Sequence, residues 1–275
     1  MKGFLDKQRM HPLALPGFDD DAITRALLGG ALLMAAYFVI QFPPYLTDQR
    51  LVEGVNVWVK PLKFSVSLGL HFMTVAVLAQ LLPRNIRVGP SLAIATYLAI
   101  GSLVLEAGYV SVQAARARRS HFNFDTNLEA LMYAAMGIGA VLLVVVAIVL
   151  GIQIWRKGIA SPGFKTGAVI GLIIGALATL VMAGYMSNSG SRWVGEHPLG
   201  GAVIPFFGWS REVGDLRPAH FVAMHMMQTL PLLGWVSDRM RLPSVALVWV
   251  AAVIQLGLAV FLFWQALQGR PFWPV

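Results

Sequence analysis

The chain has 275 residues, of which 57% are hydrophobic and only 12% are charged, and its formal net charge is +8. In a soluble protein such a charge would indicate nucleic-acid binding, but here the basic residues gather at the ends of long apolar stretches and suit anionic lipid headgroups. The absence of cysteine excludes disulfides, thiolate metal ligands and thiol nucleophiles. We therefore expect an integral membrane protein that contacts lipids and no nucleic acid.

Seven apolar stretches are long enough to cross a bilayer, which takes roughly 20 helical residues. They predict spans at Ala22–Gln41, Phe64–Leu82, Gly89–Gln113, Leu128–Trp155, Phe164–Asn188, Pro218–Val236 and Pro243–Leu267. The first stretch lacks a small-residue cleavage site after a short apolar core, so we expect it to be retained as a helix. The expected fold is an all-α bundle of about seven transmembrane helices that forms one polytopic domain over residues 1–275.

The loops between these spans form two unlike sets. Three are short and basic: Pro83–Arg87, Arg156–Lys165 and Asp238–Arg241. The other three are long and mixed in charge: Phe42–Lys63, Ala114–Asn127 and Ser189–Arg217. Compact basic loops favour the cytoplasmic side. We expect a bacterial inner-membrane protein with its N-terminus in the cytoplasm and its C-terminus outside.

Two of the long loops contain elements of their own. The segment Thr47–Trp58 has the pattern of an amphipathic helix that lies flat on the membrane surface. The apolar segment Gly200–Trp209 is too short to cross and predicts an interfacial or re-entrant lid. We expect both elements on the same face of the bundle.

Polar residues gather in the half of the bundle near the long loops. They are Glu106, Tyr109, Gln113, Tyr133, Tyr185, His220, His225 and Gln228, with His71 about midway. An ionisable group at such a depth costs roughly 2.5 to 3.5 kcal/mol and usually has a function. Transport needs polar groups through the full depth of the membrane, so this distribution favours a site that is loaded from one face.

Helical spacing places several of these residues on common faces. In the second span Ser67, His71 and Thr74 share a face with Lys60 or Lys63. In the third span Glu106, Tyr109 and Gln113 do the same. Both faces should point into the bundle, because lipid offers polar atoms no partner. The alternative is a buried hydrogen-bond network that only fixes helix packing.

The sixth span carries two histidines. The five-residue step from His220 to His225 rotates the second ring by about 140°, so the pair does not share a face as an i,i+4 zinc motif would. His225 does share a face with Gln228. In the loop before the fourth span, Thr126 and Glu129 have the spacing of a capping box, which favours a structural role for Glu129. His121 in the same loop is either an exposed loop residue or a ligand.

Three function classes fit these patterns. In the first, which we favour, the protein is a membrane oxidoreductase that holds a b-type haem and acts on a quinol or another lipid-soluble or small-molecule substrate. In the second it is a non-haem transition-metal enzyme that acts on a lipid or an isoprenoid. In the third it is a non-catalytic, proton-linked transporter or sensor. A homo-oligomer or a subunit of a membrane complex is compatible with each class.

The redox and metal readings assign a role to each candidate residue. Catalytic roles fall to Glu106, Tyr109 and Gln113, cofactor contacts to Arg116, Arg118, Arg119 and Gln228, and metal ligation to His71, His121, His220 and His225. The arginines could hold a propionate, a phosphate or a substrate carboxylate, or simply meet lipid headgroups. The glycines at 167, 171 and 175 predict a ridge for close helix packing.

Overall fold

The computed structural model describes residues 18–198 and 200–274, and it confirms the all-α membrane bundle. Six helical segments of the described chain are long and apolar enough to span a bilayer. They are α1 (Ala22–Thr47), α2 (Val59–Ala79), α4 (Pro90–Ala115), α5 (Asn127–Lys157), α10 (Ser244–Leu267) and the continuous stretch of α6 (Pro162–Ile170), the π-helical η1 (Gly171–Gly175) and α7 (Ala176–Asn188). Each overlaps the span expected from the sequence.

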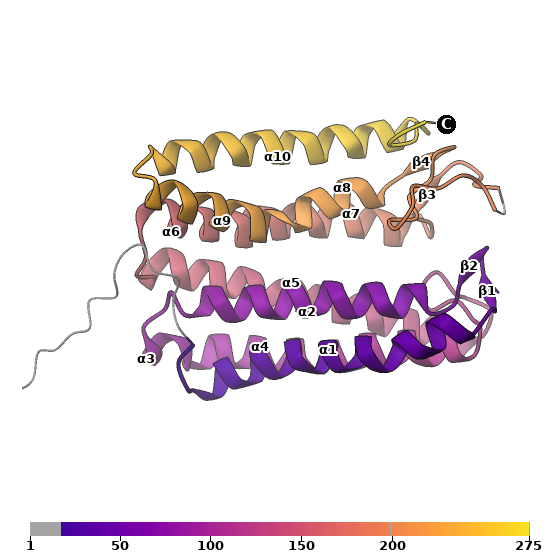
Figure 1. Ribbon diagram of the computed structural model, residues 1–275, viewed down its shortest axis with the longest axis horizontal. Coiled ribbons are helices and arrows are strands. Elements are labelled where there is room, and N and C mark those ends of the chain that lie inside the picture. Colours follow the sequence, from indigo (N-terminus) through magenta and orange to yellow (C-terminus); the bar gives the residue numbers. More distant parts are fainter. Residues whose placement is uncertain (1–17, 199, 275) are drawn as a thin grey trace, which may run out of the picture.

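The region of the seventh expected span forms two shorter helices, neither of which is among the six candidate membrane spans of the described chain. The helices α8 (Arg217–Met224) and α9 (Met226–Arg239) follow each other along the bundle and are separated at His225 (Figure 1). At this point Gln255 of α10 donates a hydrogen bond from Nε2 to the carbonyl of Val222, at 3.0 Å. A side chain that inserts beside the helical ladder is a common cause of such a break. The expected continuous helix over Pro218–Val236 is therefore corrected to a broken one.

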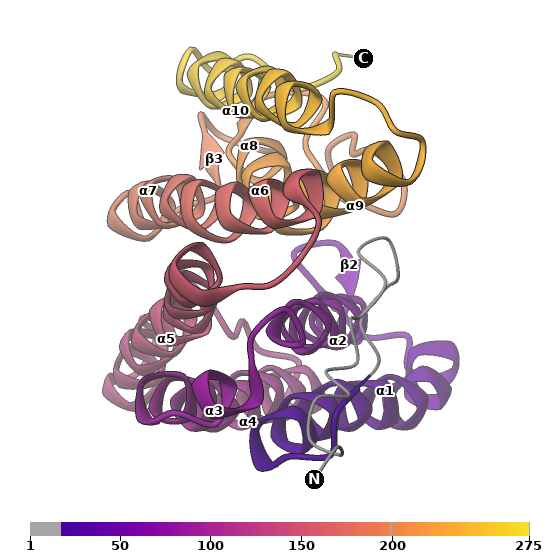
Figure 2. The same ribbon diagram turned by 90° about the vertical axis from the view of Figure 1, so that its left-hand side faces the viewer.

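The helices form two groups when the bundle is seen end-on (Figure 2). The first group contains α1, α2, α4 and α5, and the short helix α3 (Arg84–Arg87) closes its short-loop end. The second contains α6 to α10, with α10 on the outside. The helix α5 contacts both groups. A continuous buried core runs through the first group and includes Phe72, Leu103 and Val146.

Close packing within the second group depends on the glycine ridge. A Cβ atom at Gly167 would overlap the backbone carbonyl of Leu230, and one at Gly171 would overlap that of Met226. A Cβ atom at Gly175 would lie 2.8 Å from the side chain of Met226. The three glycines therefore let α6, η1 and α7 approach α8 and α9, which confirms the expected packing role.

The loop between α1 and α2 differs from the sequence expectation. Instead of an amphipathic helix, β1 (Leu51–Val52) and β2 (Val55–Asn56) form an antiparallel hairpin. The two turn residues, Glu53 and Gly54, have φ angles of 53° and 76°, and two consecutive left-handed residues are what a tight hairpin turn requires. The local turn geometry therefore outweighed the amphipathic pattern.

The loop between α7 and α8 also folds as short strands at the long-loop end. The strand β3 (Trp193–Val194) pairs antiparallel with β4 (Gly214–Asp215), and Val203 forms a bridge with Ser210 (Figure 1). The segment expected as a lid thus forms a hairpin on that face of the bundle. Its tip residue Phe206 is 82% exposed.

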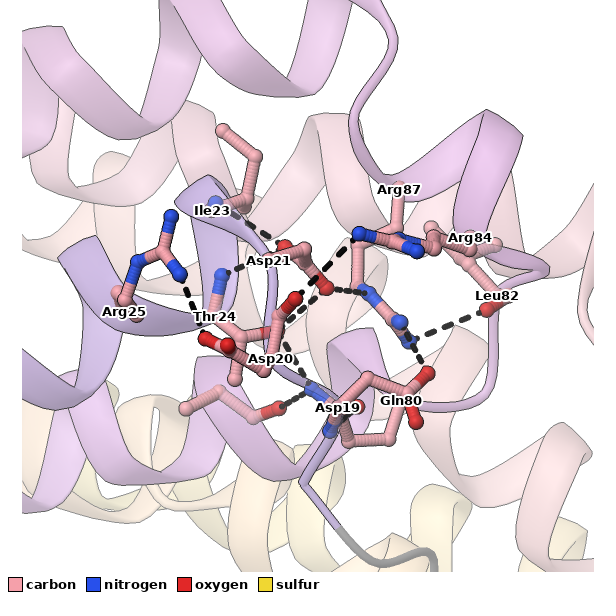
Figure 3. Close-up of polar contacts among 11 residues, drawn as sticks. Asp19, Asp20, Asp21, Ile23, Thr24, Arg25, Gln80, Leu82, Arg84 and Arg87 are labelled. Atoms are coloured by element: carbon pink, nitrogen blue, oxygen red, sulfur yellow. Dashed lines mark hydrogen bonds and ion pairs between the residues drawn. The ribbon is translucent and has the colours of Figure 1, made fainter.

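At the short-loop end of the bundle, a buried arginine of α3 forms ion pairs with the residues that precede α1. Arg87 is only 1% exposed, and its Nε donates a hydrogen bond to Asp21 Oδ2 at 2.8 Å (Figure 3). A second contact joins Arg87 to Asp19. Asp21 also caps α1 by accepting hydrogen bonds from the backbone of Ile23 and Thr24. Burial alone would raise the pKa of Asp21, but the hydrogen bonds from Thr24 and the charge of Arg87 outweigh it and lower that pKa.

Candidate functional site

The expected catalytic acid Glu106 lies in the interior, on the side of α4 that faces α5. The residue is 3% exposed, and Gly139 of α5 leaves the space that its carboxyl fills, since a Cβ atom there would lie 3.3 Å from Glu106 Oε1. This oxygen has no hydrogen-bond partner within the described residues. An unpaired buried acceptor costs about 1 to 3 kcal/mol. Glu106 is thus a carboxyl group with one oxygen free for a ligand or a proton.

Tyr109 lies one turn after Glu106 on α4 and also has an unpaired polar atom. Its hydroxyl is buried and finds no partner in the described part of the chain. Gln113, one further turn along, is different, because its side-chain amide donates to the carbonyl of Arg119 at 2.9 Å and to Glu129 Oε1 at 3.1 Å. Of the three expected catalytic residues, Glu106 and Tyr109 each have a polar atom without a partner in the described chain. Gln113 instead fixes the following loop through its hydrogen bonds.

His71 lies halfway along α2 and presents one nitrogen without a partner. Its ring forms a hydrogen bond with the backbone of Leu143 on α5 and meets the edge of Phe72, with ring centroids 5.6 Å apart. The other nitrogen, Nε2, is buried and unpaired among the described residues. A hydrogen bond to Leu143 from Nδ1 would leave the lone pair of Nε2 for a ligand.

His225 lies at the junction of α8 and α9 and is fixed by its neighbour on the same face. Its Nδ1 lies 3.2 Å from Gln228 Oε1, and the Nε2 of Gln228 donates to Thr74 Oγ1 of α2 at 3.1 Å. The ring of Phe221 packs on the imidazole, with centroids 4.2 Å apart. This chain of contacts joins the two helix groups without an intervening helix. His220 interacts electrostatically with His225.

The expected metal ligands are not gathered into one centre. In residues 18–198 and 200–274, no three His, Asp or Glu side chains are grouped so that they could hold a metal ion. His71 and His225 come from neighbouring helices, while His121 lies in the loop after α4.

His121 is enclosed by aromatic rings and is not the exposed loop residue that one reading expected. Its ring centroid lies 5.5 Å from that of Phe64 on α2 and 6.0 Å from that of Tyr133 on α5. Burial, and then the positive charges of Lys60 and Arg192, lower the pKa of His121 well below 6.5. Its imidazole is therefore neutral at pH 7 and can accept a hydrogen bond or bind a ligand.

The three arginines expected to contact a cofactor are occupied by side chains of their own segment. Arg118 forms a two-pronged ion pair with Glu129, at 2.5 and 2.6 Å. Arg116 donates to Gln113 at 2.9 Å, and Arg119 donates to Asp125 at 3.2 Å. Thr126 caps α5 and contacts Glu129 at 3.0 Å, so the capping box is confirmed. This network shapes the loop, and Arg118 and Arg119 line an open surface pocket of about 360 Å³.

Sequence reasoning missed a set of charged residues at the long-loop end. Arg192 forms a 2.6 Å ion pair with Glu53, which lies 139 residues earlier in the chain. Lys60 interacts electrostatically with both and with Glu106. The sequence did place Lys60 or Lys63 on the same helix face as His71, which indicated that a lysine of this face points into the bundle. Nothing local in the sequence indicates the pairing of Arg192 with Glu53.

The site therefore offers two oriented imidazoles, one free carboxyl oxygen and one free hydroxyl. These groups lie on α2, α4 and the α8–α9 junction. Imidazoles from facing helices can ligate a metal centre, and a free carboxyl group can exchange a proton. Comparison with known proteins found no matching family model, no similar curated protein and no similar solved structure.

Proposed function

We propose that the protein is a membrane-embedded oxidoreductase that holds a b-type haem between His71 of α2 and His225 at the junction of α8 and α9. One observation carries the proposal: the buried Nε2 of His71 has no partner within the described residues, and Gln228 holds His225 through Nδ1, which directs the other nitrogen of that ring to a different partner. Histidines that ligate metals usually have this second contact, because it fixes the tautomer and the ring orientation.

The helix arrangement is compatible with a haem inside the bundle. Cofactors in helical bundles are commonly held by side chains from facing helices. The hydrogen bond from Gln228 to Thr74 keeps α9 against α2 one turn beyond the two histidines. His71 and His225 would hold the haem iron through their imidazoles, and the haem would supply one-electron redox chemistry.

A lipid-soluble quinol is the substrate that fits the remaining polar groups. Its oxidation would release two protons and two electrons, which a bound haem would pass one at a time to a further acceptor. The unpaired oxygen of Glu106 can accept a proton from a quinol hydroxyl, and the free hydroxyl of Tyr109 can hydrogen-bond a ring oxygen. The substrate would arrive from the surrounding membrane lipids.

The orientation and the membrane are part of the proposal. Short basic loops favour the cytoplasm, so the N-terminus lies inside and the long-loop half of the bundle faces outward in a bacterial inner membrane. Quinol protons would then leave on the outer side. A second copy of the chain or another membrane subunit could receive the electrons.

The absorption spectrum of protein that is purified gently from its own membrane tests the cofactor directly. A Soret band, with close to one haem per chain by pyridine haemochrome, supports the proposal. A colourless protein with a stoichiometric transition metal would point to the non-haem reading. Protein with neither would leave only proton-linked binding at Glu106.

A further inference from the structure

The α1–α2 loop and the α7–α8 loop, called here the first and second loops, meet above the start of α2. Arg192, next to β3, donates from its Nη2 to Glu53 of the β1–β2 turn at 2.6 Å. Lys63 of α2 donates to the backbone carbonyl of Phe207 in the second loop, at 3.0 Å. These contacts join segments that lie 139 and 144 residues apart in the chain. The first turns of α2 are therefore covered by both loops.

Lys60 lies in the first turn of α2, and its ammonium group makes no direct ion pair with any described residue. Its Nζ lies 5.9 Å from the centroid of the Phe64 ring, and no hydrogen bond or ion pair of this atom occurs within the described chain. Two other cations, Arg192 and Arg217, act on Lys60 electrostatically, and the carboxylates Glu53 and Glu106 oppose their effect without contacting it. A lysine held among like charges is costly unless an anion joins it.

The charges around Lys60 do not cancel. Four cationic side chains gather here, namely Lys60, Lys63, Arg192 and Arg217. Two carboxylates are paired with them, Glu53 with Arg192 and Asp215 with Arg217. Four positive and two negative charges leave +2, or +1 when the deeper Glu106 is ionised. A dianion would compensate this excess.

Two further donors at this place also lack an acceptor. Arg192 Nε and Trp193 Nε1 are buried and unpaired among the described residues. The guanidinium of Arg192 packs over the Trp193 ring at 4.1 Å, so the donors belong to one rigid unit. Each of the free groups donates and none accepts, which selects an acceptor-rich ligand.

We propose that Lys60, Arg192 and Trp193 form a binding site for a phosphate group, carried by a lipid headgroup or by a free phosphate. A phosphate monoester carries about −1.5 to −2 charges at pH 7 and offers oxygens in several directions. Donors that approach from α2 and from the second loop match such a tetrahedral group better than a flat carboxylate, which usually takes both prongs of an arginine fork, whereas Glu53 already holds Nη2 of Arg192. The site uses neither His71 nor His225, so it goes beyond the proposed redox function.

Isothermal titration of the purified full-length protein in phosphate-free detergent buffer tests the site. One arm uses inorganic phosphate and the other uses dioctanoyl phosphatidic acid, both at constant ionic strength. We expect one phosphate group to bind per chain in at least one arm. Binding in both arms identifies a site for free phosphate, and binding of the lipid alone identifies a headgroup site.

Variants of Lys60 distinguish a specific phosphate site from nonspecific electrostatic attraction of phosphate to a basic protein. Lys60→Gln should weaken binding by roughly tenfold to a hundredfold, because a charge-assisted bond is lost. Lys60→Arg should retain most of the affinity, and Lys157→Gln, at the exposed short-loop end, should match the wild type. Wild-type protein that binds neither probe, or folded Lys60→Gln protein that binds like the wild type, would overturn the proposal. If Lys60→Gln does not fold, the proposal still requires phosphate to raise the melting temperature of the wild type above that in chloride.

Discussion

Gln228 of α9 and Thr74 of α2 are joined by a hydrogen bond of 3.1 Å, and the same glutamine holds the ring of His225 through its carbonyl oxygen at 3.2 Å. One side chain thus connects the two helix groups and orients a histidine at a helix break. On the haem proposal, Gln228 does not touch the iron but positions the ligand that does.

Removal of the contact between Gln228 and His225 should weaken haem binding. Gln228→Leu should lower haem affinity by roughly 10- to 100-fold, which is the usual cost of losing a partner of a ligating histidine. The measurement is haem retention during dilution or transfer to an acceptor such as apomyoglobin. Gln228→Glu should restore most of the affinity, because a carboxylate can also hold Nδ1–H.

A second glutamine provides a matched control for this variant. Gln153 also makes a single side-chain bond to another helix, to Ser91 at 2.8 Å, but it does so near the short-loop end. Gln153→Leu should keep wild-type haem retention. Equal losses of haem in Gln228→Leu and Gln153→Leu would show that these interhelical hydrogen bonds affect haem retention only through the stability of the protein.

The ion pair of Arg87 with Asp21 should dominate stability at the short-loop end. Asp21→Ala leaves a buried guanidinium short of a partner and removes the cap of α1, so we expect a loss of roughly 3 to 5 kcal/mol in unfolding free energy. Denaturant unfolding in mild detergent measures it. Asp20→Ala, which removes an exposed pair with Arg25, should change little.

The same carboxyl gives this pair a defined pH dependence. The folded-state pKa of Asp21 is lowered, so its contribution is present above the unfolded value of about 3.9 and is lost as the pH falls through the folded value. The gap in stability between wild type and Asp21→Asn should therefore narrow in acid. A gap that is constant from pH 6 to pH 3 would contradict the assignment.

The glycine ridge predicts a sharp contrast between two alanine substitutions. Gly171→Ala forces a methyl group against the backbone of Met226, and we expect it to destabilise the protein by about 1 to 3 kcal/mol. Gly184 has no atom within 4 Å of the corresponding position, so Gly184→Ala should be neutral or stabilising by up to about 1 kcal/mol. Thermal unfolding of the two variants in parallel checks this. Similar melting temperatures would refute the packing argument.

Labelling with a membrane-impermeant thiol reagent tests the orientation, because the chain contains no native cysteine. Ser189→Cys and Lys157→Cys place a thiol at exposed positions at the two ends of the bundle. In intact cells or right-side-out vesicles, we expect label at Ser189→Cys only. Label confined to Lys157→Cys would reverse the topology and leave the site geometry unchanged.

Features set by short-range periodicity could be predicted from the sequence. The membrane spans, the capping box at Glu129 and the shared face of His225 and Gln228 depend on spacings within a few residues. The polar stripes also place Glu106 in the interior, because lipid penalises polar atoms.

Features that depend on distant partners or on backbone detail could not be predicted in this way. The pairing of Arg192 with Glu53 joins two loops that no local pattern relates. The break at His225 involves Gln255 of α10, and the sequence does not reveal which helix this glutamine contacts. The β1–β2 hairpin needs a left-handed glutamate at residue 53, an uncommon conformation that sequence pattern does not reveal.

The most direct test of the haem proposal is the haem content of three variants measured side by side with wild type. His71→Ala and His225→Ala each remove one proposed haem ligand, whereas His220→Ala removes a neighbouring imidazole that the haem proposal does not use. With all three inserted at wild-type levels, we predict that the Soret band is lost in the first two and kept in the third. Haem that is kept in both His71→Ala and His225→Ala, or lost only in His220→Ala, would contradict the account.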